Sequence, residues 1–305
     1  MFSISQIRAH ARQTIEQTPG IYLLGLAPAL VSLFSSLISF FRNSSSSTVN
    51  QEALNSLTSG HFEDSLASTT SFTSTISASL FPLLIGILLS FILLSLTFTI
   101  LNILRKHQEG TGFKDGFTIF QHQHFGKIFF TVFIKRLLLF LWGLIYLIGL
   151  VMIIGGLVGL IVCALLSMNS AYDPETIQYM LGMFTGILII GLCIFAFGLA
   201  IYLPQELAYS QVEILLFEQL EAGTYTGPMA LIKESRRIMK GYKFKLLLLS
   251  LSFIGWFFLQ GLSFGLVGIY VYPYYSAAKI HFYNAVLKDR KMKEDVLSGN
   301  FTTTA

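Results

Sequence analysis

Charged residues are scarce in this 305-residue chain, at 12% of the total. Soluble globular domains carry about 25% charged residues, so the composition excludes an ordinary soluble domain. Five long stretches contain no Asp, Glu, Lys or Arg: Gln17–Phe41, Ser65–Leu104, Leu137–Tyr172, Thr176–Gln205 and Leu246–Ala278. Each stretch includes an apolar run long enough to cross a bilayer, which takes about 20 helical residues. The sequence therefore predicts a polytopic membrane protein.

The chain also lacks the clusters and motifs of residues that most catalytic and metal sites require. Its two cysteines, Cys163 and Cys193, lie separately inside apolar runs, which excludes a disulfide framework and a cysteine-based zinc site. His122 and His124 have no cysteine or carboxylate pair nearby, and the nucleotide, zinc-protease and serine-hydrolase motifs are absent. We therefore expect no enzymatic activity, no catalytic residue, no metal and no cofactor.

Ionisable side chains are nearly absent from the predicted membrane helices. Lys279 and His281, toward the inner end of the last helix, are the exceptions. Proton- and ion-coupled carriers place such residues inside their helices, so a coupled transporter is disfavoured. Carriers of uncharged solutes and lipid-handling proteins are not excluded by this reasoning.

The N-terminal segment, residues 1–20, does not have the features of a cleavable signal peptide. The apolar run that follows is about 20 residues long, longer than a signal core, and no small-residue cleavage site follows it. Ile4, Ile7, Ala11 and Ile15 recur at helical spacing. This pattern indicates a short helix on the membrane surface, although a solvated leader would also fit.

We predict an all-α fold, a transmembrane bundle of six helices with both termini in the cytoplasm. The first four crossings are Ile21–Phe41, Leu80–Leu104, Leu137–Leu165 and Tyr179–Leu203, with Ile128–Arg136 in the interface and Pro204 ending the fourth. The run from Leu246 to Leu287 is long enough for two more crossings, joined by a turn near Gln260–Gly265. This topology puts 19 of the 20 Lys and Arg residues in the cytoplasm and Arg42 alone outside, as the positive-inside rule requires.

The predicted membrane domain therefore covers residues 21–287, and residues 288–305 form a basic cytoplasmic tail. Within the predicted membrane domain, residues 43–79 form an outer loop with 18 Ser or Thr among its 37 residues. Such a segment buries too little apolar surface to offset its ordering entropy, so we expect a mobile tether. Glycines four residues apart (Gly155 and Gly159, Gly182 and Gly186) are expected to pack helices closely.

The cytoplasmic segment 205–245 contains a predicted amphipathic helix that opens at Gly227 and Pro228. Lys233, Arg236, Arg237 and Lys240 have the i, i+3, i+4, i+7 spacing of one helical stripe, named here the basic stripe. Leu231, Ile232, Ile238 and Met239 lie on the opposite side. The pattern is typical of a helix on an anionic membrane surface. Docking of a cytoplasmic partner, or a role in setting topology alone, would also explain it.

The last two predicted helices carry the densest polar chemistry at membrane depth. Their candidate intramembrane cavity residues are Trp256, Gln260, Tyr270, Tyr272, Pro273, Tyr274 and Tyr275. Tyrosine prefers the membrane interface. A cluster of tyrosines beside a proline therefore indicates structural polar packing, a ligand or lipid cavity, or a helix shallower than predicted.

The segment from Ala230 to Leu287 resembles a family of integral membrane proteins of Gram-positive bacteria, domain of unknown function number 975. The matching residues are Ser235, Met239-Lys240-Gly241, Leu251 to Trp256, Gly265, Gly268, Pro273-Tyr274 and Phe282-Tyr283. The resemblance implies a bacterial cell-membrane location and several helices. It implies no known activity, and the family has no catalytic residues to transfer to this chain.

These observations favour a non-enzymatic membrane protein that binds lipid or a protein partner as an accessory factor of the cell envelope. The expected partners are membrane lipids, anionic on the cytoplasmic face, or a membrane or cytoplasmic protein, and no nucleic acid. The alternative is a channel or permease for an uncharged or amphiphilic solute. A continuous cavity reaching Tyr270–Tyr275 would favour that alternative.

Overall fold

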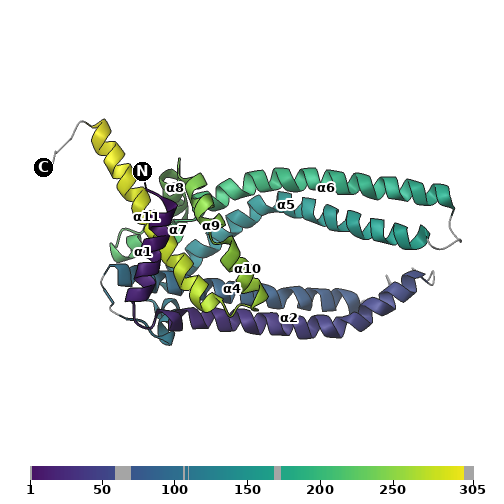
Figure 1. The fold of residues 1–305 in the computed structure, drawn as a ribbon, viewed down its shortest axis with the longest axis horizontal. Helices are drawn as coiled ribbons and strands as arrows, with labels where there is room; N and C mark the ends of the chain where they lie inside the picture. Colours follow the sequence, from purple (N-terminus) through teal and green to yellow (C-terminus); the bar gives the residue numbers. More distant parts are fainter. Residues whose placement is uncertain (1, 59–69, 106, 109, 168–172, 299–305) are drawn as a thin grey trace. The chain divides into compact units, whose positions relative to one another are not determined.

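The computed structural model describes residues 2–58, 70–105, 107–108, 110–167 and 173–298, which form helices and no strand (Figure 1). The elements are α1 (Ile4–Gln17), α2 (Ile21–Thr58), α4 (Thr70–Leu104), the 3-10 helix η1 (Phe113–Gln121), α5 (Phe125–Ser167), α6 (Pro174–Tyr209), α7 (Val212–Glu221), α8 (Pro228–Ile238), α9 (Lys243–Leu251), α10 (Ile254–Leu262) and α11 (Gly268–Leu297). Contacts divide the chain into two units. The first comprises Met1–Phe125 and Lys245–Ala305, and the second comprises Gly126–Phe244.

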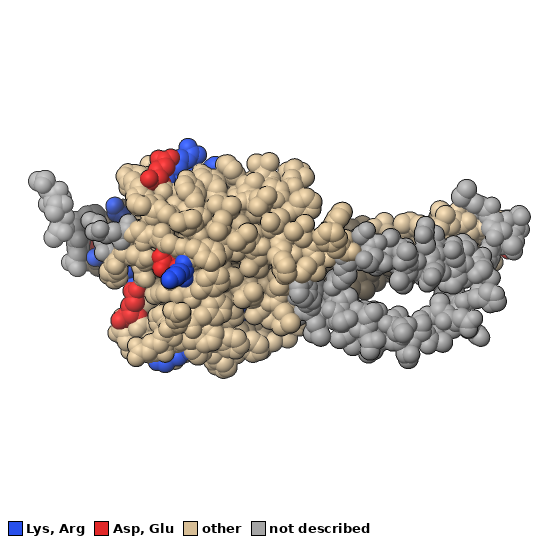
Figure 2. All heavy atoms as spheres, turned by 90° about the horizontal axis from the view of Figure 1, so that it is seen from below, with Lys and Arg blue, Asp and Glu red and all other residues tan. Residues whose placement is uncertain are grey.

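Four helical spans are long and apolar enough to cross a membrane: Ile21–Phe41, Leu84–Leu104, Phe125–Ser167 and Pro174–Glu221. A fifth would be the pair α9 and α10, which passes the same test together but is bent by 42°. The sixth predicted crossing, in α11, is not found among the described residues. The all-α class is therefore confirmed, four or five helices could cross a membrane, and the count of six is not confirmed. On the face in Figure 2, charged side chains are few and leave a wide uncharged surface.

The first unit is built around α11. Val271, Tyr274, Ala278, Phe282 and Val286 are all fully buried, although α11 as a whole is only weakly apolar. The helix α11 packs on α2, α1 and α4. The predicted N-terminal helix is confirmed as α1, where the Ser3 side chain and Gln6 form a capping box, and its buried face, including Ile7, Ala11 and Ile15, packs on α11.

The 3-10 helix η1 packs on α4 and α2. Polar side chains of α4 form hydrogen bonds with its backbone. Ser95 Oγ donates to the carbonyl of Asp115 at 2.9 Å and accepts from the Ile119 backbone N–H at 3.4 Å. Thr99 Oγ1 donates to the same Asp115 carbonyl at 3.2 Å. Hydrogen bonds within a 3-10 helix have poor geometry, and the hydroxyls of an otherwise apolar helix add further bonds to its backbone.

The second unit contains α5 and α6, which run side by side (Figure 1). They approach through glycines at which an added Cβ would lie within 3.1 Å of the other helix: Gly149, Gly156 and Gly159 on α5, and Gly191 and Gly198 on α6. The predicted packing glycines Gly155, Gly182 and Gly186 instead face open space. The prediction from glycines four residues apart was therefore wrong for these three. The glycines that do pack, Gly149 with Gly156 and Gly191 with Gly198, are seven residues apart, so each pair is separated by two helical turns and lies on the same side of its helix.

Several predicted boundaries also change. Residues 128–168 belong to one continuous helix up to Ser167, with no break at Lys135, and α6 continues through Pro204 to Tyr209. Within the predicted loop 43–79, α2 continues to Thr58 and α4 begins at Thr70, while residues 59–69 lie outside the described part. Extending an existing helix adds one hydrogen bond per ordered residue, which is easier than nucleating a new helix.

The first prediction concerns stability and follows from the close approach of α11 to α2. A Cβ at Gly25 would collide with the backbone carbonyl of Ile269, whereas a Cβ at Gly86 would meet nothing within 4 Å. We expect Gly25→Ala to destabilise the protein by about 1–3 kcal/mol, as overpacking does. Gly86→Ala should be neutral or slightly stabilising, because alanine favours helix. Thermal unfolding in detergent measures both, and equal stability of the two variants would contradict this packing.

Candidate functional site

The C-terminal hairpin consists of α10, the turn Ser263–Val267 and α11. Phe264 and Gly265 in the turn have positive φ values of 53° and 94°, a conformation that glycine adopts readily. A Cβ on Gly265 would lie 2.6 Å from the Cβ of Ser32 in α2. The turn therefore rests directly on α2, and any larger residue at position 265 would separate them.

The position of Ser32 indicates how far the hairpin extends along α2. It lies eleven residues beyond Ile21, where the apolar span begins, or about 16 Å along the helix. The hydrocarbon core of a bilayer is about 30 Å thick. The hairpin turn thus reaches about halfway along the apolar part of α2.

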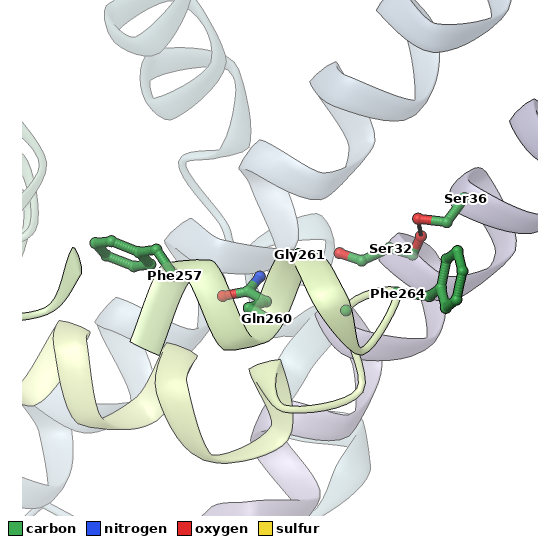
Figure 3. A pocket seen from close by; sticks show the side chains of 7 residues that line it. Ser32, Ser36, Phe257, Gln260, Gly261 and Phe264 are labelled. Carbon is green, nitrogen blue, oxygen red and sulfur yellow. Dashed lines mark hydrogen bonds between the residues drawn. The ribbon is translucent and has the colours of Figure 1, made fainter. Parts of the chain in front are cut away.

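A pocket of about 330 Å³ lies beside this turn. Its lining comes from α2, α10 and the turn: Ser32, Ser36, Phe257, Gln260, Gly261, Phe264 and Gly265. Figure 3 shows Ser32 and Ser36 on α2, Phe257 and Gln260 on α10, and Phe264 in the turn after it. No charged residue is in this lining, so the pocket combines two aromatic rings with uncharged hydrogen-bonding groups.

The hydrogen bonds of the pocket form a short chain. Gln260 Nε2 donates to Tyr272 Oη at 2.5 Å, and the hydroxyls of Tyr272 and Ser32 are 2.9 Å apart. Ser36 Oγ donates to the Ser32 carbonyl at 2.9 Å. Among the described residues, the Gln260 side-chain carbonyl accepts no hydrogen bond, so one end of this amide is left for another molecule.

The other candidate cavity residues are absent from the lining of the pocket. Tyr275 Oη is 3.0 Å from Ser250 Oγ, and Arg8 Nε donates to Tyr274 Oη at 3.4 Å. The Tyr270 ring lies 5.2 Å from the Trp256 ring, and α11 continues through buried Pro273. These contacts favour structural packing for the tyrosine cluster, with Gln260 as the one member of the set that faces the pocket.

The N-terminal helix meets α11 beyond the tyrosines. Thr14 Oγ1 and His281 Nε2 are 2.8 Å apart, and the His10 ring lies 5.9 Å from the His281 ring. Burial lowers the pKa of His281, which lies outside the spanning helices, and the nearby His10 lowers it further. The neutral imidazole is therefore favoured in the folded protein.

Three residues of the basic stripe, Lys233, Arg236 and Arg237, lie on α8 in the second unit, and Lys240 lies in the turn after it, because the helix ends at Ile238. Lys233, Arg236, Arg237 and Lys240 are all exposed, while Leu231, Ile232, Ile238 and Met239 are buried. Arg237 lies 3.8 Å from Glu234. The buried face packs on α6 and α7, and Ser235 Oγ donates to the Ala208 carbonyl of α6 at 2.7 Å. The apolar face is therefore used inside the protein and is not available to insert into lipid.

An ion pair that the sequence did not predict lies in the same unit. Lys135 of α5 and Glu213 of α7 are 2.7 Å apart and largely buried. Thr131 of α5 also shares a hydrogen bond of 2.9 Å with Tyr225. These contacts hold the polar first turns of α5 against the segment between α6 and α8. Opposite charges 78 residues apart give no sequence signal, so only the fold could pair them.

The family described as "Protein of unknown function (DUF975)" matches residues 28–290, and the chain belongs to this family. The comparison with curated proteins gave no match, and neither did the comparison with solved structures. The family assignment agrees with several apolar helices and assigns no activity. The signature residues have structural roles here: Gly265 touches Ser32, Ser235 bonds to α6, and Tyr274 and Phe282 are fully buried.

The second prediction concerns the hydrogen bonds of Tyr272. Tyr272→Phe removes a hydroxyl that contacts both Ser32 and Gln260, and it should destabilise the protein by about 0.5–1.5 kcal/mol. Tyr179→Phe is the matched control, because Tyr179 is 78% exposed on α6. Thermal unfolding in detergent compares them. A Tyr272→Phe protein as stable as the control would mean that this hydroxyl contributes nothing to packing.

Proposed function

We propose that this chain is a non-enzymatic, multi-pass cell-membrane protein that binds anionic lipid at its cytoplasmic face, as an accessory factor of the cell envelope. The observation that carries the proposal is the attachment of α8 to α6. Ser235 bonds to Ala208, only a few residues beyond the apolar run that ends near Leu203. The basic stripe is thereby held close to the end of a spanning helix, where lipid headgroups would lie.

Electrostatics supports lipid as the ligand of the basic stripe. Each basic residue near an anionic membrane contributes about 1 kcal/mol, and charge interactions extend about 10 Å at 0.1 M salt. Because the apolar side of α8 is packed inside the protein, binding rests on charge and not on insertion. An interaction of this kind weakens steeply with salt.

For topology, we propose that α2, α4, α5 and α6 cross the membrane and that both termini are cytoplasmic. The hairpin of α10 and α11 then enters and leaves through the cytoplasmic face, in keeping with its turn resting at Ser32. Six crossings would give the termini the same sidedness. Both arrangements keep 19 of the 20 basic residues inside, as the positive-inside rule favours.

Thiol labelling in intact cells tests the topology. On a background with Cys163→Ala and Cys193→Ala, a membrane-impermeant reagent should label Ser167→Cys, at the end of α5, and spare Ser298→Cys. Leu262→Cys, beside the hairpin turn, should remain unlabelled from outside, because the turn stops within the membrane. Labelling of position 298 would refute the cytoplasmic termini. Labelling of position 262 at the rate of position 167 would establish two full crossings.

Charge removal tests lipid binding. Replacing Lys233, Arg236, Arg237 and Lys240 by Gln should weaken association with phosphatidylglycerol vesicles by about 100-fold or more, since four contributions of about 1 kcal/mol are lost. The control replaces Lys114, Lys127, Lys288 and Lys291 by Gln, the same change in net charge on exposed residues elsewhere. Binding of phosphatidylglycerol vesicles to the protein held in nanodiscs of uncharged lipid measures both. Equal losses in the two variants would show a general effect of net charge and no site on α8.

A further inference from the structure

We infer that the pocket beside the hairpin turn binds an uncharged, hydroxyl-bearing glycerolipid of the diacylglycerol type. This pocket is a different surface from the basic stripe, and only its depth in the membrane depends on the topology proposed above. Three properties of the pocket support such a ligand: the chemistry of its lining, its size and that depth.

The lining selects against charge. No Lys, Arg, Asp or Glu is among its residues, and a phosphate or ammonium group entering it would be left without a partner. Desolvating an unpaired charge costs far more than desolvating a hydroxyl. A phospholipid headgroup is therefore a poor occupant, and an uncharged polar group is a good one.

The lining offers hydrogen bonds that suit a hydroxyl. Gln260 uses one end of its amide on Tyr272, and the other end has no partner among the described residues. If the amide were turned, its oxygen and nitrogen would change places, and one of the two would still have no partner. Ser36 donates to the Ser32 carbonyl, and its oxygen can still accept. A ligand hydroxyl can donate its one hydrogen to the Gln260 carbonyl oxygen. If the amide is turned, the hydroxyl can accept from the amide nitrogen and donate to Ser36 Oγ.

The rest of the pocket suits an apolar body. Phe257 and Phe264 are 39% and 53% exposed, and their rings border the pocket (Figure 3). A volume of about 330 Å³ lies within the range of about 300–1,000 Å³ of small-molecule sites. It can hold the glycerol group and the first part of an acyl chain, with the remaining chain lying in the surrounding lipid.

Depth accounts for the preference over other lipids. The turn reaches about halfway along the apolar span of α2, and Ser36 lies one helical turn further. Charged headgroups remain at the membrane surface because of the cost of entering hydrocarbon. Burying the hydroxyl of an uncharged diacylglycerol costs far less than burying a charge, so this lipid can reach the pocket. The polar groups of the hairpin then gain a partner where water is absent.

The test uses dioleoylglycerol and the full-length protein in detergent, with bound lipid counted by native mass spectrometry during a titration. Gly261→Leu fills the pocket from its lining, and Gly255→Leu is the matched control on the same helix. An added Cβ meets nothing within 4 Å at either position, and leucine favours helix, so both variants should fold. Gln260→Met keeps the side-chain length and removes the amide.

We expect Gly261→Leu to weaken dioleoylglycerol binding by about tenfold or more and Gly255→Leu to leave it unchanged. Gln260→Met should also weaken it, and phosphatidylglycerol should not compete. The variant lacking the basic stripe should keep full dioleoylglycerol binding, which separates this inference from the proposed function. Wild-type protein without saturable dioleoylglycerol binding, or equal binding by Gly255→Leu and Gly261→Leu, would overturn the inference.

Discussion

The contact on which the first unit depends is the approach of the C-terminal hairpin to α2. Two glycines permit it, Gly25 beside the Ile269 carbonyl and Gly265 beside Ser32. Neither position tolerates a side chain without displacing one of the helices. This contact sets how far the hairpin extends along α2 and brings Gln260 next to Ser32. The pocket, the hydrogen bonds of Tyr272 and the burial of α11 follow from that placement.

A second constraint is that polar groups among apolar helices need partners within the protein. The hydroxyls of Ser95 and Thr99 bond to the 3-10 segment, and Thr97 contacts Ser276 of α11 at 3.4 Å. Tyr272 and Tyr275 bond to serines of neighbouring helices. Serine, threonine and tyrosine in these helices therefore join elements together. Gln260 differs from them because part of its amide is left without a partner among the described residues.

The amphipathic helix α8 shows how one sequence pattern can serve two purposes. Its apolar residues, which resemble the inserting face of a surface helix, pack on α6 and α7. Its basic residues remain exposed. Helical periodicity shows only that the apolar and polar faces are separate, and either lipid or protein can cover the apolar one. In this structure protein covers the apolar face of α8, so the exposed basic residues can bind a ligand only through their charge.

The sequence by itself determined the membrane class, the all-α fold, the N-terminal helix, the start of α8 and the family. These rest on local composition and periodicity, which depend only on neighbouring residues. The continuation of α6 through Pro204 and the choice of packing glycines were decided by tertiary structure. Gly149 packs against α6 whereas Gly155, six residues later, faces open space, because only one side of α5 meets that helix. The pocket likewise joins Ser32 to Gln260 across more than 200 residues, a distance over which no local pattern carries information.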